Sequence, residues 1–312
     1  GAGRGGRRPR HHRLVRALNL AGESGPAAGG RLRAAFSGEP GAFAEDALLA
    51  ALEAPLPLPV GGFREVFEAV RDGLADIGVV PIENVVNGTV REVYDLLLEH
   101  DLVIRGEVVV PVRLCLAALP GSRLEQVERV YSHIQALGQA DRFLRGRPWA
   151  LLTTYNTAGA GRLIAEEGEA GAAAVLSPRA AAHFGLSILA DGIENDPANR
   201  TRFLLVGRPD GPLPAGWRRP IEGPTAPRTT LAFAVRNQPG TLLAILQVLA
   251  DRRLNLSTLE SRPSRQVAWE YVFWADIDAD LLTTPAASAL EEIRPLTTMV
   301  RVLGAYERGA AG

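Results

Sequence analysis

Short apolar runs alternate with amphipathic stretches through the first two thirds of the chain. Residues 32–36 and 77–80 are nearly continuous apolar segments of the kind that forms buried strands. Between them, apolar side chains recur at i, i+3, i+4 and i+7 from Phe63 to Val70, which predicts one buried face of a helix. The pattern therefore indicates a strand, a helix and a second strand in this order.

The same alternation continues to residue 207. Residues 90–98 have a helical pattern and residues 102–112 an extended one. Further short apolar runs, each followed by a helical stretch, lie at residues 130–132, 151–153 and 173–176. This order predicts an α/β fold of βαβ units around a mostly parallel sheet. Ligands of such sheets bind beyond the carboxyl ends of the strands, so the strand-to-helix loops are the candidate site.

A second, smaller domain follows a proline-rich segment. Residues 208–228 contain six prolines, which disfavour a helix or an interior strand and predict a linker. Strand patterns in the domain that follows, 229–306, lie at residues 230–235, 268–275 and 300–305. The side chains from Leu242 to Leu249 mark a helix face between the first two. A ferredoxin-like βαββαβ domain fits this order.

Both ends of the chain are predicted to be tails. Residues 1–30 are rich in Gly and Arg, carry no acidic residue before Glu23, and lack the long apolar core of a secretory signal. We interpret them as a solvated basic tail rather than a nucleic-acid-binding arm. Residues 307–312 form a short second tail. No apolar run has membrane-spanning length, so we expect no membrane partner. The single cysteine fits a reducing cytoplasm, and the net charge of −1 disfavours a nucleic-acid partner.

Composition narrows the possible chemistry. The 312 residues are 46% apolar and 22% charged, with a net charge of −1, as in ordinary globular proteins. Lysine is absent, which excludes pyridoxal-phosphate enzymes and Walker A nucleotide sites because both need its amine. The one cysteine, Cys115, excludes an internal disulfide and lies in an apolar run typical of an inert core thiol. One thiol also excludes a thiolate metal cluster, and the composition gives no positive sign of a metal centre or a cofactor.

Two polar loops follow predicted strands in the first half of the chain. Residues 37–43 place two glycines ahead of a helix, where backbone N–H groups can approach an anion, although a plain turn is the alternative. Residues 81–90 contain Asn84, Asn87 and Thr89, which can hydrogen-bond a carboxylate or a hydroxyl. Capping of the next helix by Asn87 or Thr89 explains the same residues equally well.

Two more such loops carry ionisable residues. His133 follows Ser132 at a strand end and can donate a proton near neutral pH, unless Ser132 merely caps the helix that follows. Asn199 to Arg202 lead directly into an apolar strand. Arg202 can pair a carboxylate bidentately, whereas Thr201 can reflect β-propensity alone.

Taken in order, these loops resemble the signature motifs of the prephenate dehydratase family. The family's glycine-rich, PIEN, SHxQAL and NxTRF motifs are matched by residues 38–43, 81–84, 132–137 and 199–203. After the linker, residues 255–256 and 260–263 resemble the NL and ESRP motifs of the attached phenylalanine-binding ACT domain. The chain departs from the family at Val85, where a serine is usual, at Ile134, where a proline is common, and at Thr241, where an alanine is usual.

The resemblance implies a two-lobed catalytic domain at 31–207, similar to periplasmic binding proteins, and an ACT domain at 229–306. The implied reaction is cofactor-free decarboxylating dehydration of prephenate to phenylpyruvate. Thr201 would act on the leaving hydroxyl, and His133 is the second choice as general acid. The implied substrate contacts are Asn84, Asn87, Ser132, Gln135, Thr157, Arg202 and Phe203. The implied effector contacts are Gly240, Thr241, Leu242, Asn255, Leu256, Glu260, Ser261, Arg262 and Pro263.

The resemblance also implies regulation and leaves alternatives open. Phenylalanine would bind where ACT domains pair across the subunits of a homodimer or homotetramer and would favour an inactive state. Arogenate is the alternative substrate and would give phenylalanine directly. A non-catalytic amino-acid sensor and a transport-type binding protein are alternatives from other classes, the second disfavoured by the lack of an export signal in the sequence.

Overall fold

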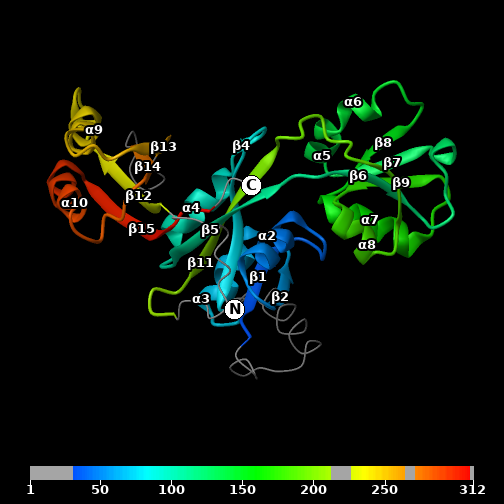
Figure 1. The fold of residues 1–312 in the computed structure, drawn as a ribbon, viewed down its shortest axis with the longest axis horizontal. Helices are drawn as coiled ribbons and strands as arrows, with labels where there is room; N and C mark the ends of the chain where they lie inside the picture. The colour runs from blue at the N-terminus through cyan, green and yellow to red at the C-terminus, as the bar shows by residue number, and fades with distance from the viewer. Residues whose placement is uncertain (1–30, 212–225, 264–270, 310–312) are drawn as a thin grey trace, which may run out of the picture.

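The computed structural model describes residues 31–211, 226–263 and 271–309. Figure 1 shows three parts: a central lobe, a second lobe at the right, and a smaller C-terminal domain at the left. The tail predicted at residues 1–30 and residues 212–225 of the predicted linker lie outside the described residues.

The central lobe is built on one mixed sheet in the order β2-β1-β3-β11-β5, with the short β4 paired to β3. Its strands are β1 (Arg33–Ser37), β2 (Leu56–Val60), β3 (Ile77–Asn84), β4 (Gly88–Thr89), β5 (Val103–Pro111) and β11 (Arg200–Gly207). The first three pair in parallel, whereas β11 is antiparallel to both β3 and β5. The antiparallel strand arises because the chain returns from the second lobe and enters the sheet from its opposite end.

Helices cover both faces of this sheet. They are α2 (Phe43–Ala51), α3 (Phe63–Arg71) and α4 (Arg91–Glu99). Alternate strand residues point to opposite faces, so Phe36 and Leu205 pack with α2, while Val80 and Leu204 pack with α3 and α4. The helix face predicted from Phe63 to Val70 is therefore confirmed as part of the core.

The second lobe has its own sheet in the order β10-β6-β9-β7-β8. Its elements are β6 (Cys115–Ala118), η1 (Leu124–Gln126), β7 (Arg129–Ser132), α5 (Ile134–Gln139), α6 (Asp141–Leu144), β8 (Ala150–Thr153), α7 (Thr157–Glu167), β9 (Ala172–Leu176), α8 (Pro178–His183) and β10 (Ser187–Asp191). The β8, β7 and β9 strands are parallel to one another. The β6 strand is antiparallel to β9, and β10 is antiparallel to β6. Cys115 is buried in this lobe, and burial raises the pKa of its thiol to about 12, as expected of an inert core residue.

Two chain segments connect the lobes, one after β5 and one before β11. They are held side by side, because Val112 N donates to Asn199 O at 2.9 Å and Leu114 N donates to Glu194 Oε2 at 3.0 Å. Two adjacent connecting segments of this kind can act as a hinge between the lobes.

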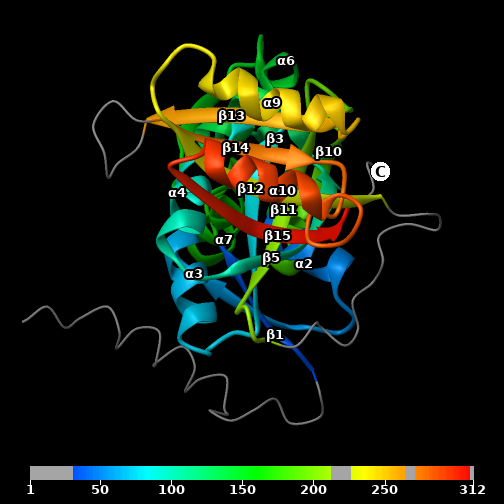
Figure 2. The ribbon, with the colours of Figure 1, turned by 90° about the vertical axis from the view of Figure 1, so that its left-hand side faces the viewer.

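The C-terminal domain is a four-stranded sheet with helices on one face. Its elements are β12 (Pro227–Val235), α9 (Thr241–Asp251), β13 (Leu256–Pro263), β14 (Tyr271–Ile277), α10 (Ala287–Ile293), η2 (Arg294–Leu296) and β15 (Met299–Glu307). The order β13-β14-β12-β15 with antiparallel pairs is that of a ferredoxin-like domain. Figure 2 looks onto α9 and α10, which lie over the sheet.

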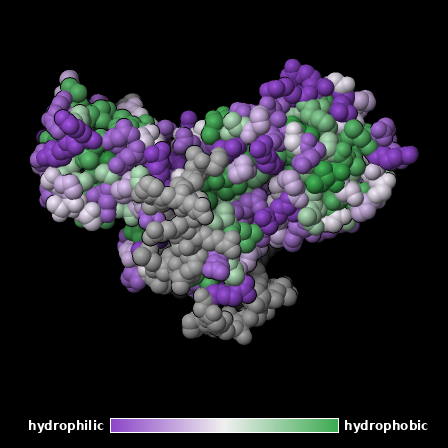
Figure 3. Space-filling view, viewed as in Figure 1, coloured by the Kyte–Doolittle hydropathy of each residue, from purple (hydrophilic) through white to green (hydrophobic). Residues whose placement is uncertain are grey.

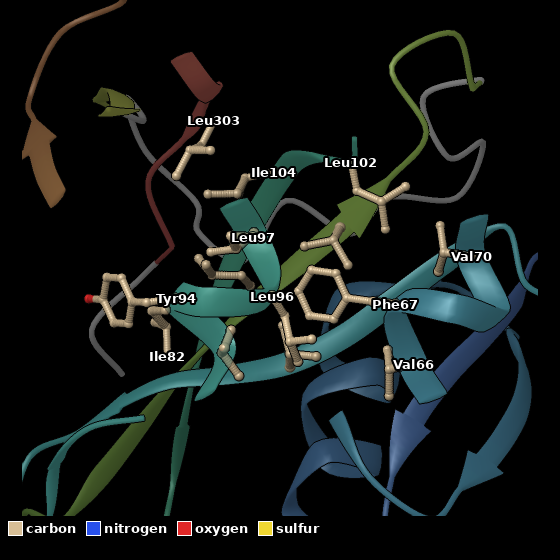
Figure 4. Close-up of a cluster of buried hydrophobic side chains, with 14 of the residues drawn as sticks. Val66, Phe67, Val70, Ile82, Tyr94, Leu96, Leu97, Leu102, Ile104 and Leu303 are labelled. Carbon is tan, nitrogen blue, oxygen red and sulfur yellow. The ribbon is translucent and has the colours of Figure 1, made fainter. Parts of the chain in front are cut away.

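The other face of this sheet packs against the central lobe. Leu231 and Phe233 of β12 point to α9 and α10, whereas Ala232 and Ala234 join a cluster shared with the central lobe. Figure 4 shows that shared cluster, with Leu303 of β15 beside Ile104 of β5. The approach is close, because a Cβ added at Gly304 would lie 2.3 Å from the carbonyl oxygen of Ile104. The two domains therefore share one continuous hydrophobic core.

The predicted α/β class with a ferredoxin-like second domain is confirmed. Some boundaries differ. The β12 strand begins at Pro227, inside the predicted linker, as proline permits at the first position of a strand. The predicted tail at 307–312 begins as the last residue of β15, and Gly309 N donates to Glu107 at 2.9 Å. The strand expected at 268–275 begins at Tyr271 among the described residues.

Candidate active site

A cavity of about 420 Å³ lies between the two lobes, at the loops that follow the strands. Its central-lobe lining is Ser37, Gly38, Gly41, Ala42, Phe43, Ala44, Gly61, Gly62, Phe63, Pro81, Glu92, Thr201 and Phe203. Its second-lobe lining is His133, Tyr155, Asn156, Thr157, Ala158 and Ser177. Figure 3 shows hydrophobic residues gathered on the visible face of the second lobe. The cavity is where the rule for α/β sheets places a ligand.

The glycine-rich loop of the central lobe touches the second lobe beside this cavity. Ser177 Oγ donates to Gly41 O at 2.8 Å, and the Tyr155 hydroxyl donates to Glu39. At Gly41, φ is +86°, and an added Cβ would lie 2.5 Å from the Cα atom of Ala180. Glycine is therefore required both for the backbone conformation and for the approach of the lobes.

Two helix N-termini border the cavity. The first residues of α2 and α3 line it, and neither helix has a side-chain cap. Uncapped N–H groups and the helix dipole favour an anion at such a position. The described lining contains no arginine, and its carboxylate is that of Glu92. Backbone groups, rather than cationic side chains, would therefore hold a carboxylate here.

Thr201 has the geometry of a hydrogen-bond donor to a ligand. Its Oγ1 accepts a hydrogen bond from Asn84 Nδ2 at 2.9 Å. The orientation of that amide is fixed, because Asn84 Oδ1 accepts from the backbone N–H groups of Val86 and Asn87. Within the described residues, no acceptor lies in hydrogen-bond reach of the hydroxyl's own proton. That proton is therefore available to a group in the cavity.

His133 and Thr157 reach the cavity from the second lobe. His133 precedes α5, and its Nδ1 accepts from Gln135 N at 3.3 Å. This contact leaves Nε2 as the ring nitrogen that carries a proton in the neutral form. Thr157 is the first residue of α7. The helix is capped by Asn156, whose Oδ1 accepts a hydrogen bond from Gly159 N at 2.5 Å. Neither helix cap considered from the sequence is present: His133 rather than Ser132 caps α5, and α4 has Val90 at its N-cap position, without a side-chain cap from Asn87 or Thr89.

Besides Asn84, four residues expected to contact substrate do not line the cavity. Ser132 is fully buried and donates to Val175 O at 2.6 Å, so it joins β7 to β9. Gln135 and Asn87 are exposed outside the cavity. Arg202 points away from it, because Thr201 and Phe203 on the same strand face the cavity and neighbouring side chains alternate. The placement of these four residues does not support direct substrate contact.

Asn84 has a supporting place rather than a place in the cavity wall. Its amide donates to Asn199 Oδ1 at 2.9 Å and to Arg200 O at 3.0 Å, as well as to Thr201. It thereby joins the loop after β3 to the start of β11. Val85, where the family usually has serine, is exposed at the tip of this loop.

Several lining residues were not predicted as site residues from the sequence. Gly61 and Gly62 form the turn between β2 and α3, and Glu92 lies in the first turn of α4. Tyr155, Asn156 and Ser177 come from the second lobe. The turn at 61–62 has the same strand-glycine-helix pattern as residues 37–43, so this signal was available. Glu92 has no local signal that separates it from any exposed helical carboxylate.

The expected effector residues fall in two places within one chain. A cavity of about 170 Å³ is lined by Gly240, Thr241 and Leu242. The Thr241 hydroxyl donates to Arg236 O at 2.8 Å and so serves its own loop. The remaining expected contacts immediately precede or lie on β13, an edge strand: Asn255, Leu256, Glu260, Ser261, Arg262 and Pro263. Of these, Asn255 donates to Asp278 at 2.7 Å and Arg262 pairs with Asp95 of α4 at 3.2 Å.

The described part of the chain contains neither a membrane-spanning helix nor a metal-binding group of side chains. No helix there is long and apolar enough to span a bilayer. No group of three or more His, Cys, Asp or Glu side chains there is placed to bind a metal ion.

Comparison with known proteins agrees with this architecture. The sequence profile of prephenate dehydratase matches residues 34–211, and that of the ACT domain matches residues 229–295. Arogenate dehydratase 5, chloroplastic, of Arabidopsis thaliana is 38% identical over 90% of this chain and 68% of its own length.

Two solved structures resemble the chain over most of its length. The Arthrobacter aurescens prephenate dehydratase in complex with L-Phe is 31% identical, with a TM-score of 0.77 over 90% of both chains. GqqA, described as a novel type of quorum quenching acylase, is 32% identical, with a TM-score of 0.79 over 88% of this chain and 98% of its own. From its matched domains and from the identity to these relatives, the chain belongs to the prephenate dehydratase family.

Proposed function

We propose that this protein catalyses the decarboxylating dehydration of prephenate to phenylpyruvate. The observation that carries the proposal is the Thr201 hydroxyl, which accepts from Asn84 and keeps its own proton for the cavity. Prephenate carries a ring hydroxyl that leaves as water and a ring carboxylate that leaves as carbon dioxide. A hydrogen bond from Thr201 to the leaving oxygen would stabilise the negative charge that develops there.

The rest of the cavity suits the other demands of this reaction. As the ring carbon–carboxyl bond breaks, its electron pair completes the aromatic ring, and the ring carbon–oxygen bond breaks with its own pair; the hydroxide released takes a proton from His133 or from solvent and leaves as water. The departing carboxylate benefits from poorly solvated surroundings, and Phe43, Phe63 and Phe203 offer apolar lining. The side-chain carboxylate would lie at the uncapped N-terminus of α2 or α3. His133 remains the second candidate for protonating the leaving group.

Arogenate is the second candidate substrate, favoured by one lining residue. Arogenate has an ammonium group where prephenate has a keto group, and Glu92 places a carboxylate in the cavity wall. The named Arabidopsis relative is an arogenate dehydratase. An ion pair between Glu92 and the ammonium would favour arogenate, while prephenate would gain nothing from it.

The test is turnover of each substrate by the purified full chain at neutral pH. Phenylpyruvate from prephenate supports the first candidate, and phenylalanine from arogenate supports the second. Replacing Glu92 with Gln is expected to lower kcat/KM for arogenate about fivefold, the effect of roughly 1 kcal/mol for an exposed ion pair. Prephenate turnover should change less than twofold, as should both activities in the matched control Glu125→Gln. Turnover of neither substrate would refute both candidates and leave the amino-acid sensor.

We propose phenylalanine as the effector, bound by the ACT domain. The support is the cavity at Gly240–Leu242 and the L-Phe complex of the Arthrobacter relative. Because the Gly240 loop and the β13 motif lie apart in one chain, pairing of ACT domains in a homodimer or homotetramer would bring them together. Light scattering with and without phenylalanine tests this, and a monomer under both conditions would refute it. We retain the cytoplasm as the proposed location.

A further inference from the structure

One strand separates the cavity from the C-terminal domain. Thr201 and Phe203 of β11 line the cavity, whereas Leu204, on the opposite face, joins the cluster that contains Ala232 and Trp274. Side chains alternate along a strand, so Arg202 also points to the C-terminal domain. The sheet of that domain therefore packs on the back of the strand that presents Thr201.

Arg202 is held there by a buried ionic cluster of Glu107, Arg202, Arg228 and Asp276, here called the Arg202 cluster. The exposed fractions of these side chains are 1%, 11%, 6% and 6%. Two of its contacts cross between domains: Arg202 Nη1 to Asp276 Oδ2 at 2.7 Å, and Arg228 Nη1 to Glu107 Oε2 at 2.8 Å. Arg202 Nη1 also lies 3.2 Å from Glu107 Oε2. The charges of these four residues balance, and two further carboxylates border the cluster: Glu83 Oε2 lies 3.4 Å from Arg202 Nη2, and Asp278 Oδ1 lies 3.5 Å from Arg228 Nη2.

The C-terminal domain fixes the position of Asp276 in turn. Its Oδ1 accepts from Thr230 Oγ1 at 2.7 Å, and Thr230 lies 2.8 Å from the Tyr306 hydroxyl. Burial alone lowers the pKa of Arg202, but the carboxylates of Asp276 and Glu107 outweigh it and leave that pKa raised. The guanidinium is therefore charged, and these carboxylates offset the free-energy cost of burying that charge.

The pairing of β11 with β3 is irregular beside Arg202. Opposite β3 the register shifts between Arg202 and Phe203, which pair with Glu83 and Pro81. The residue passed over is Ile82 of β3, so the pairing of β11 with β3 is interrupted beside Arg202, whereas its pairing with β5 runs without a shift from Arg200 to Leu205.

We propose that Arg202 is a positioning residue for Thr201 and that Asp276 of the ACT domain controls it. A change in the ACT sheet would shift Asp276, move the Arg202 guanidinium and tilt the Thr201 hydroxyl away from the leaving group. The catalytic part of this inference rests on the proposed role of Thr201. The mechanical part, that Asp276 holds this section of β11, does not.

The test compares four full-length proteins: the parent, Asp276→Asn, Thr230→Val and the control Arg301→Gln. Thr230→Val removes one hydrogen bond to Asp276 without removing a charge, in case Asp276→Asn fails to fold. Arg301 also joins the domains, donating to His100 O at 2.8 Å, but does not touch Arg202. Hydrogen exchange of peptides covering 199–203, and kcat and KM on the accepted substrate, are measured for each.

In Asp276→Asn we expect exchange at 199–203 to rise at least threefold and kcat to fall at least tenfold, with KM within twofold. Thr230→Val should show a smaller change in the same direction, and Arg301→Gln should match the parent. Unchanged exchange in both test variants, or equal changes in Arg301→Gln, would overturn the inference. If the parent converts neither substrate, the proposed function fails, while the exchange comparison still decides whether Asp276 holds β11.

Discussion

The Thr201 hydroxyl offers the sharpest test of the site. Replacing Thr201 with Val keeps the shape and the β-propensity of the side chain but removes its one donor and its acceptor. The loss of the donor should lower kcat by roughly 10²–10³, the usual effect of removing one hydrogen bond that stabilises developing charge. KM should stay within a few-fold, because helix N-termini, and not Thr201, are the expected carboxylate ligands.

The same substitution should cost little stability. Asn84 Nδ2 has two hydrogens and three acceptors within 3.0 Å, so after loss of Thr201 Oγ1 it keeps Asn199 Oδ1 and Arg200 O. No buried donor is left unpaired, and the free energy of unfolding should change by about 1 kcal/mol or less. A large loss of activity with an almost unchanged unfolding curve therefore separates a role in the reaction from a role in folding.

The assay is steady-state turnover, with urea unfolding of the same preparations. Thr201→Ser is the matched control, since it retains a hydroxyl and should keep at least a tenth of the parent kcat. A Thr201→Val protein with kcat within threefold of the parent would refute the assigned role. So would a Ser variant as impaired as the Val variant, since the methyl group would then be what matters.

Two further predictions concern the closure of the lobes and the effect of pH on folding. Gly41→Ala should reduce kcat/KM and enlarge the radius of gyration measured by X-ray scattering, because the added Cβ would collide with Ala180 of the second lobe. The control Gly121→Ala changes a glycine with the same φ of +86° but open space around it, and it should have neither effect. The buried His100 has its pKa lowered below the ordinary 6.5, mainly by burial. The unfolded chain therefore binds the proton more readily, and this contribution to stability is full above pH 6.5 and is lost as pH falls below it, by at most about 1.4 kcal/mol per pH unit. Urea unfolding between pH 7 and 5 should show this slope, and His100→Leu should flatten it; an equal slope in both proteins would assign it to other groups.

Local pattern was sufficient for much of this protein. The helix from Phe63 and the strands at 77–80 and 173–176 follow from short-range periodicity, which depends only on neighbouring residues. The loops at 37–43 and 199–203 follow from the rule that sites lie at strand ends. Alternation along β11 also implies that Arg202 and Thr201 face opposite ways, although the sequence alone did not say which side held the site.

Contacts between residues far apart in the chain decided which side chains face the cavity and which face other parts of the protein. Glu92 and Gly61 reach the cavity because α3 and α4 pack against the central sheet, and Ser132 is unavailable because β9 lies beside β7. Taken alone, Arg202 looks like a ligand for a substrate carboxylate, but the three carboxylates with which it pairs, Glu83, Glu107 and Asp276, belong to the protein. The sequence determined which segments form strands, helices and polar loops, and only the tertiary structure decided which polar side chains meet a ligand and which meet one another, since burial and pairing are properties of the packed chain.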